Sequence, residues 1–184
     1  MNRMEKEVRR SRREWIPKKE QIGVIIALVV AVLFLFWQLK GLVQTPTATI
    51  HSKHFEHTFK DFGSYARVAL FVVLAYYVLL FVIRQRIWGN LSNVKKWLSA
   101  LLRLARRLHT PLAIIAIAFI VLHAVAVFMY GFKLDFNNIS GLLALLVLLP
   151  VPVSGLLRYQ RLDRKWHLRS GLAFAVLFLI HAFL

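Results

Sequence analysis

The sequence of 184 residues contains no cysteine. This absence excludes disulfide bonds, iron–sulfur clusters held by cysteine, and covalent attachment of haem through a C-x-x-C-H motif. The sequence also lacks the nucleotide-binding patterns G-x-G-x-x-G and G-x-x-x-x-G-K-[ST]. Acidic residues are scarce, with 8 Asp and Glu against 25 Lys and Arg and a formal net charge of +17. A charge this large favours either nucleic acid or an anionic membrane surface as a partner, and its placement along the chain decides between them.

Apolar residues are abundant: 59% of the chain is hydrophobic and the mean hydropathy is +0.61. That is too apolar for a soluble domain of this size. The apolar residues form runs near the 20 or so that a membrane-spanning helix needs. We therefore predict an all-α integral membrane protein: a basic cytoplasmic segment, residues 1–20, followed by a five-span helical bundle, residues 21–184. The expected spans are Gly23–Leu42, Tyr65–Ile83, Pro111–Tyr130, Ile139–Leu157 and Trp166–Leu184.

Basic residues concentrate in three segments, which hold 20 of the 25 Lys and Arg. These segments are residues 3–19, 84–107 and 158–169. Five spans place all three on one side of the membrane, and cytoplasmic loops carry such an excess. We therefore expect a cytoplasmic N-terminus and an outer C-terminus, in a bacterial cell membrane. The charge then serves topology and contact with membrane lipid, and no nucleic-acid partner is expected.

Two further features bear on the helices. Residues 91–108 have apolar positions at helical spacing and basic residues mostly on the other faces. This segment is either an amphipathic helix on the inner membrane surface or an early start of the third span. In the fourth span, Pro150 and Pro152 must disturb the hydrogen-bond ladder, so a kink is expected there.

Four of the seven histidines lie in the third and fifth spans or at their inner edges, and we call them the four membrane histidines. Within each span the two histidines are fourteen residues apart: His109 and His123, His167 and His181. Fourteen residues make nearly four helical turns and rise about 21 Å, so each pair shares one helix face at two depths. With one span between them the two helices run parallel. His109 and His167 then share an inner level, and His123 and His181 share an outer level.

A histidine pair at one level suits the two axial positions of a haem iron. Two levels predict two b-type haems, bound without covalent attachment. Small and aromatic residues on the same faces offer an apolar slot for the porphyrin: Ala113, Ala116, Gly171, Phe174 and Phe178. Basic residues at the inner level could neutralise propionates: Arg106, Arg107 and Arg169.

The stretch "RRLHTPLAIIAIAFIVLHAVAVF" followed by "RKWHLRSGLAFAVLFLIH" resembles the transmembrane domain of the ferric reductase family. That family includes the NADPH oxidases and the haem subunit of the bacterial methionine sulfoxide reductase system. The resemblance covers about Leu91 to Leu184 and implies that the four membrane histidines ligate haem for electron transfer across the membrane. The cytochrome b of quinol-oxidising complexes has a similar spacing. No flavin or nicotinamide domain follows His181, so we expect a separate cytoplasmic flavin reductase or membrane quinol as donor, and an outer acceptor.

Other interpretations stay open. Intramembrane histidines also occur in transporters that move protons or metal ions, although the third and fifth spans contain no Asp or Glu. A haem-binding anchor subunit without its own turnover has the same sequence features, so whether the protein is an oxidoreductase component is undecided at this point. His51, His54 and His57 form an H-x-x-H-x-x-H series in an expected outer loop. A solvated polar loop is the favoured interpretation of the series, and a metal site is the alternative.

Overall fold

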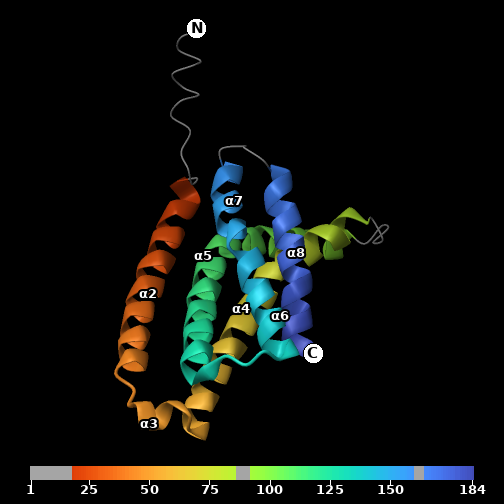
Figure 1. Cartoon of the computed structure of the whole chain (residues 1–184). Coiled ribbons are helices and arrows are strands. Elements are labelled where there is room, and N and C mark those ends of the chain that lie inside the picture. Colours follow the sequence, from red (N-terminus) through yellow and green to blue (C-terminus); the bar gives the residue numbers. More distant parts are fainter. Residues whose placement is uncertain (1–17, 86–91, 160–163) are drawn as a thin grey trace, which may run out of the picture. The chain divides into compact units, whose positions relative to one another are not determined.

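The computed structural model describes residues 18–85, 92–159 and 164–184, and the regular elements in these ranges are all α-helices (Figure 1). The helices are α2 (Lys18–Val43), α3 (Thr47–Ile50), α4 (Lys53–Arg84), α5 (Ser92–Gly131), α6 (Phe136–Leu148), α7 (Pro150–Tyr159) and α8 (Arg164–Phe183). Most of the expected basic N-terminal segment, residues 1–17, lies outside the described residues.

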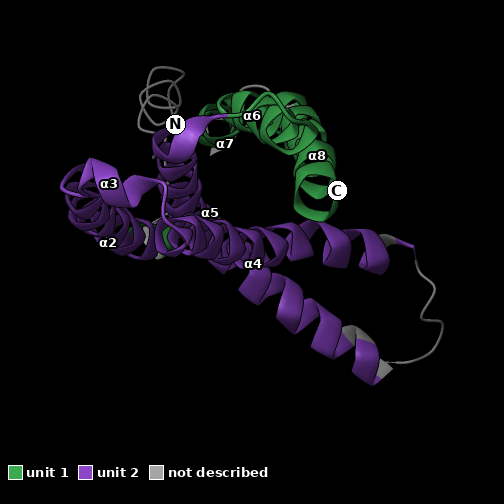
Figure 2. Cartoon of the chain, turned by 60° about the horizontal axis from the view of Figure 1, so that its bottom comes forward, with its two compact units in different colours: residues 1–21, 133–184 green, residues 22–132 purple. Residues whose placement is uncertain are grey.

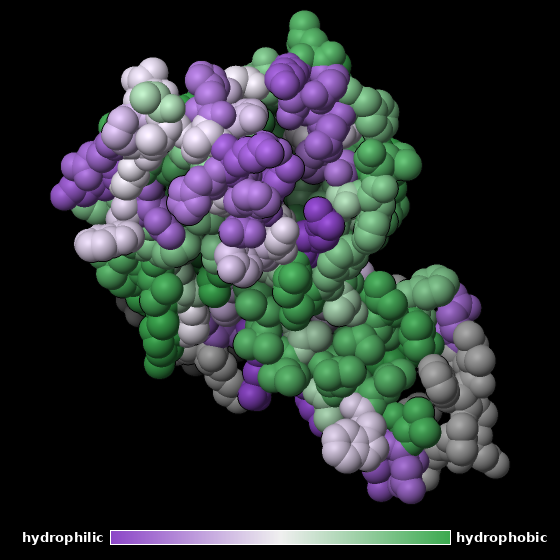
Figure 3. Space-filling model, turned by 90° about the horizontal axis from the view of Figure 1, so that it is seen from below, coloured by the Kyte–Doolittle hydropathy of each residue, from purple (hydrophilic) through white to green (hydrophobic). Residues whose placement is uncertain are grey.

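Five stretches of helix in the described residues are long and apolar enough to cross a membrane. They are Glu20–Val43, Lys53–Ile83, Lys96–Gly131, Phe136–Leu157 and Lys165–Phe183. Large apolar side chains such as Phe36 and Trp37 are exposed on these helices, as a lipid-facing surface requires. On the face seen in Figure 3, hydrophilic residues gather in one area and the flanking surface is hydrophobic. The predicted all-α membrane fold with five spans is confirmed.

The second membrane helix begins earlier than the sequence predicts, because α4 starts at Lys53 rather than near Tyr65. Ser52 caps its N-terminus by accepting a hydrogen bond from the backbone N–H of Phe55, with an Oγ–N distance of 3.2 Å. The expected outer loop is therefore short, and His54 and His57 lie in the first turns of α4. Polar residues in those turns lower the local hydropathy and conceal the helix from a search for apolar runs.

The segment 91–108 does not form a separate helix, because from Ser92 it is the first part of α5, continuous with the third span. Pro111 lies inside this helix, and the two views in Figures 1 and 2 show α5 bending near its middle. A proline removes one backbone hydrogen bond and crowds the preceding turn, which accounts for the bend. At its other end α5 stops at Gly131, whose φ of 119° is accessible mainly to glycine.

The fourth span is divided into α6 and α7, as the two prolines predict. Leu149 separates the two helices, and its N–H donates to Leu146 O at 3.3 Å, a tighter turn than the α-helical one. Pro150 then starts α7, where its missing N–H is tolerated.

The chain forms two compact units, residues 22–132 and residues 133–184 together with 1–21 (Figure 2). In the first, α4 packs extensively along α5, and a core cluster centred on Leu122 and Ala126 joins them to α2. An edge-on contact between the rings of Phe34 and Phe119, 5.2 Å apart, belongs to this packing. In the second unit, α8 packs against both α6 and α7.

Candidate functional site

His123, in α5, lies against the backbone of α4. Its Nδ1–H donates to the carbonyl oxygen of Phe59 at 2.7 Å. Below the ring is Gly63, where an added Cβ would come within 3.0 Å of both Cε1 and Nδ1 of His123. In a helix the carbonyl of residue 59 points towards residue 63, so a side chain at 63 would cover that oxygen. Glycine leaves the oxygen accessible, and the imidazole ring occupies the space of the absent side chain.

His109 makes the corresponding contact one level away on the same two helices. Its Nδ1 lies 3.3 Å from the carbonyl oxygen of Val73, the longest of the distances between a membrane histidine and a carbonyl. The residue four positions after Val73 is Tyr77, not glycine. The rings of Tyr76 and Tyr77 lie 5.6 and 5.7 Å from the His109 ring, centroid to centroid. Two tyrosine rings therefore lie beside His109, whereas His123 packs against Gly63 and the ring of Phe59, 6.2 Å away between centroids.

His181, in α8, packs in the same way on α6. Its Nδ1 lies 3.0 Å from the carbonyl oxygen of Asn137 and 3.3 Å from Oγ of Ser140. The Ser140 hydroxyl itself donates to the Asn137 carbonyl at 2.9 Å. An added Cβ at Gly141 would come within 2.8 Å of the His181 ring, closer than real Cβ atoms approach a neighbour.

His167 repeats this arrangement on α7. Its Nδ1 lies 3.2 Å from the Val151 carbonyl oxygen and 3.2 Å from Oγ of Ser154. The Ser154 hydroxyl donates to the Val151 carbonyl at 2.9 Å. A Cβ at Gly155 would lie 3.3 Å from the ring. His167 and Ser154 are both buried, which makes this the most enclosed of the four positions.

The four membrane histidines thus share one geometry, in which Nδ1 faces a backbone carbonyl of the adjacent helix. A carbonyl oxygen only accepts, so Nδ1 must carry the proton. In the neutral ring the lone pair then belongs to Nε2. The accepting carbonyls are also fourteen residues apart in each unit, at residues 59 and 73 and at residues 137 and 151. They follow the reverse order of the histidines, as antiparallel helix packing requires.

The sequence contains a signal for these partners that the search for histidines missed. The tetrapeptide S-G-L-L occurs at residues 140–143 and again at 154–157, with the same fourteen-residue separation as the histidines. A small residue that recurs on one face of a membrane helix permits close approach of a neighbouring helix. The matched separations identify α6 and α7 as the helices against which His181 and His167 pack.

The predicted haem-binding residues fall in both units. His109 and His123 belong to residues 22–132, and His167 and His181 belong to residues 133–184. Their pairing into two levels stays a prediction. The three predicted propionate partners are exposed: Arg106, Arg107 and Arg169. Arg106, three residues before His109, is its neighbour on the helix surface. Arg107 and Arg169, each two residues from a histidine, project to other sides.

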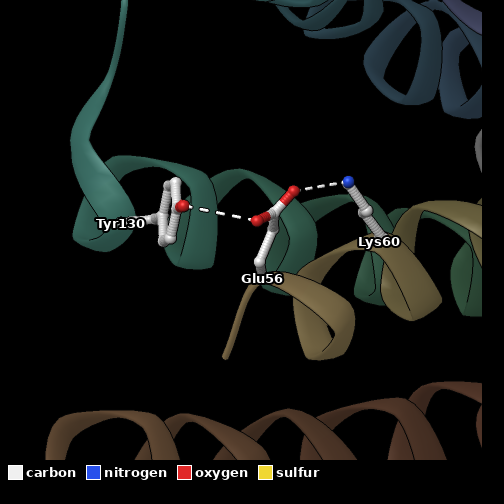
Figure 4. A network of polar contacts seen from close by, with 3 residues as sticks. All are labelled: Glu56, Lys60 and Tyr130. Atoms are coloured by element: carbon white, nitrogen blue, oxygen red, sulfur yellow. Dashed lines mark hydrogen bonds and ion pairs between the residues drawn. The ribbon is translucent and has the colours of Figure 1, made fainter. Parts of the chain in front are cut away.

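The outer histidine series does not come together as one ligand set. His51 follows α3, and its ring lies 5.9 Å from that of Tyr130, whereas His54 and His57 lie on α4. Across the described ranges, no group of three or more His, Cys, Asp or Glu is arranged to hold a metal ion. The polar contacts nearby are an ion pair between Glu56 and Lys60 and a 3.4 Å hydrogen bond from the Tyr130 hydroxyl to Glu56 (Figure 4). The ion pair lies within α4, and the hydrogen bond from Tyr130 links the start of α4 to the end of α5.

The donor chemistry of the four membrane histidines fits b-type haem. Haem-ligating histidines bind iron through one imidazole nitrogen, while the other ring N–H donates to a backbone or side-chain acceptor that fixes the ring. Each of the four rings has such an acceptor at Nδ1. At three of them a glycine provides a cradle that a Cβ would fill. The phenyl rings of Phe174 and Phe178, stacked 6.0 Å apart on α8, provide apolar surface in the same unit as His167 and His181.

In comparisons with known proteins, no family model, no curated protein and no solved structure matched this chain.

Proposed function

We propose that this protein is a di-haem b-type membrane cytochrome that transfers electrons across the membrane. His109 and His167 ligate one haem, and His123 and His181 ligate the other. The N-terminus is cytoplasmic and the C-terminus lies outside. A separate cytoplasmic flavin reductase or a membrane quinol would supply the electrons on the inner side, and an acceptor outside the membrane would take them. In this role the protein is a component of an oxidoreductase.

The observation that carries the proposal is the common state of the four rings. Two helices in different units each carry a pair of histidines fourteen residues apart, and each Nδ1 faces a backbone carbonyl. A ring held in this way has its orientation and tautomer set before any metal binds. Four histidines in apolar helices have a high energetic cost that a structural role alone does not explain.

The chain's own residues bind and orient the cofactor and exclude water. Haem, when bound, supplies one-electron chemistry at its iron. The carbonyls of residues 59, 73, 137 and 151 accept the Nδ1 protons and increase the electron donation of the imidazoles. The apolar helix faces keep water from the ligands, and Arg106 is the basic residue best placed beside His109 to neutralise a propionate.

The same geometry argues against a proton path through these histidines. In a relay an imidazole must accept a proton at one ring nitrogen and release it at the other. Here each Nδ1 proton faces a carbonyl oxygen, which is too weak a base to take the proton. The third and fifth spans also contain no carboxylate that could act as the next carrier.

The absorption spectrum of the purified protein tests the proposal. The protein is expressed with adequate haem supply, and spectra are recorded before and after reduction with dithionite. We expect a b-type spectrum with about two haems per chain by pyridine haemochrome analysis. The His54→Ala variant is the matched control, because it removes a histidine outside the four and should keep both haems. A colourless protein would contradict the proposal and favour a transporter.

A second experiment tests the orientation. Twenty of the 25 basic residues lie on one side of a five-span chain, which predicts that the C-terminus lies outside. A reporter that is active only outside the cytoplasm, fused after Leu184, should therefore be active. Activity of a cytoplasm-only reporter at the same position would contradict the orientation.

A further inference from the structure

Ser140 and Ser154 form one three-atom hydrogen-bond pattern at two places, and Ser154 Oγ also lies 3.5 Å from Oγ of Ser170 in α8. In each, the serine hydroxyl donates to the carbonyl oxygen three residues earlier at 2.9 Å. In each, a histidine Nδ1 of α8 lies within 3.3 Å of the serine Oγ and within 3.2 Å of the same carbonyl oxygen. The Nδ1–H therefore points between two acceptors on one helical turn.

Both serines are buried, with exposed fractions of 5% for Ser140 and 7% for Ser154. A buried hydroxyl in an apolar helix is stabilising only where its hydrogen bonds are made, and here the carbonyl and the imidazole make them. A serine that only bonded back to its own helix would not have to face the histidine. The recurrence after fourteen residues, in register with both histidines, ties the hydroxyls to the imidazoles.

We propose that Ser140 and Ser154 are positioning residues that hold His181 and His167 with Nε2 directed at a haem iron. The proposal rests on the proposed function and deepens it. With two acceptors around Nδ1, rotation of the ring about its χ2 angle is restricted in both directions. The second acceptor also strengthens donation from Nδ1–H, which makes Nε2 a stronger donor to iron and favours ferric over ferrous haem.

The test is redox titration of Ser140→Ala and Ser154→Ala in the purified haem protein, with the components resolved by low-temperature spectra. Each substitution removes one acceptor and a single oxygen atom. We expect the midpoint potential of one haem to rise, a different haem in each variant, while haem content is retained. Ser140→Thr and Ser154→Thr keep the hydroxyl and should restore the wild-type potentials.

The matched control is Ser64→Ala. Ser64 is also next to a glycine in a membrane helix, and it donates to a carbonyl of its own helix, Lys60 O, at 2.9 Å, but it is exposed. This variant should leave both potentials unchanged. Equal shifts in Ser64→Ala and Ser154→Ala, or no shift in either α6–α7 variant, would overturn the proposal.

A second readout does not depend on haem. Ring-nitrogen NMR of protein prepared without haem reports the histidine tautomers. We expect His167 and His181 to carry the proton on Nδ1, and the Ser→Ala variants to increase the share protonated on Nε2. If the purified wild-type protein binds no haem but the Ser→Ala variants still change the tautomers, the proposed function is contradicted. The role of the two serines in orienting the imidazole rings is then retained. Unchanged tautomers in both variants would overturn the positioning role itself.

Discussion

Residues 22–132 and residues 133–184 both hold two histidines against backbone carbonyls, but the residues next to those carbonyls differ. In both units an antiparallel helix presents backbone carbonyls fourteen residues apart to two histidines. On α6 and α7 a Ser-Gly pair lies three and four residues after each accepting carbonyl, at residues 140–141 and 154–155. On α4 the residues at these two positions are Phe62 and Gly63 after the carbonyl of residue 59, and Tyr76 and Tyr77 after that of residue 73.

The comparison shows which part of the arrangement is common to all four histidines and which part differs between them. The carbonyl acceptor is present at all four positions, and the residue below the ring varies. Where that residue is glycine, Nδ1 lies 2.7–3.2 Å from the carbonyl oxygen. Where it is Tyr77, the distance is 3.3 Å. The carbonyl contact therefore does not require glycine, and at His109 it forms beside aromatic side chains.

Loss of a membrane histidine should have the largest effect. If each unit contributes one ligand to each haem, His109→Ala and His167→Ala should remove or perturb the same spectral component, and the double variant should do little more. His123→Ala and His181→Ala should do the same to the other component. Combining His109→Ala with His123→Ala should remove both. Haem content and redox titration measure this. A common haem for His109 and His181 would show that the two helices are not parallel.

Replacing the glycines that contact the histidine rings by alanine should have the next largest effect. The loss of stability should be greatest where the added Cβ has the least space. Gly141→Ala puts a Cβ at 2.8 Å from His181, and Gly63→Ala puts one at 3.0 Å from His123. Overpacking of this kind destabilises by about 1–3 kcal/mol. Against it stands the gain of about 0.5–1 kcal/mol from replacing glycine by alanine in a helix. We expect net destabilisation and lower haem occupancy for Gly141→Ala, with Gly63→Ala intermediate.

The same series contains its own controls. At Gly155 the added Cβ would lie 3.3 Å from His167, so the two terms should nearly cancel. At Gly41, in α2 and outside the expected porphyrin slot, the Cβ would meet nothing within 4 Å, and Gly41→Ala should be neutral or stabilising. Thermal denaturation in detergent, followed by haem absorbance, gives the ranking. Equal effects of Gly141→Ala and Gly41→Ala would contradict the cradle described for His181.

The tyrosines beside His109 should have the smallest effect. Tyr77→Leu removes an edge-on ring contact with His109, and such contacts contribute about 0.5–1.5 kcal/mol. We expect a modest loss of thermal stability and a spectral change limited to the haem ligated by His109. Tyr65→Leu is the matched control on the same helix pair, because Tyr65 contacts the ring of Phe119 and not a histidine. If Tyr65→Leu changed the spectrum as much as Tyr77→Leu, the effect could not be attributed to the contact between Tyr77 and His109.

Much of the fold could be predicted from the sequence because hydropathy and proline act locally. The five apolar runs predict the five membrane helices, and Pro150 predicts the break between α6 and α7. The start of α4 could not be predicted in this way. Its first turns are polar, and the helix begins there because Ser52 caps it.

The candidate site could be predicted only in part. The histidine spacing is visible in the sequence, but the acceptors are backbone carbonyls, which every residue has. Which carbonyl accepts from Nδ1 depends on which helix is the neighbour and on its register. The residue types at positions 59 and 151 do not identify these carbonyls as acceptors. The repeated S-G-L-L was the one local sign of that register, and it becomes meaningful only when its separation is compared with that of the histidines.

Electron paramagnetic resonance of the oxidised, purified protein tests the central claim most directly, because it reports the axial ligands of the iron. Two imidazoles on each iron predict low-spin ferric signals from both haems, with no substantial high-spin signal. Each His→Ala variant should convert one low-spin signal to high spin or abolish it, and His54→Ala should change neither. A protein without haem, or a wild-type protein with high-spin iron only, would contradict ligation by the four membrane histidines.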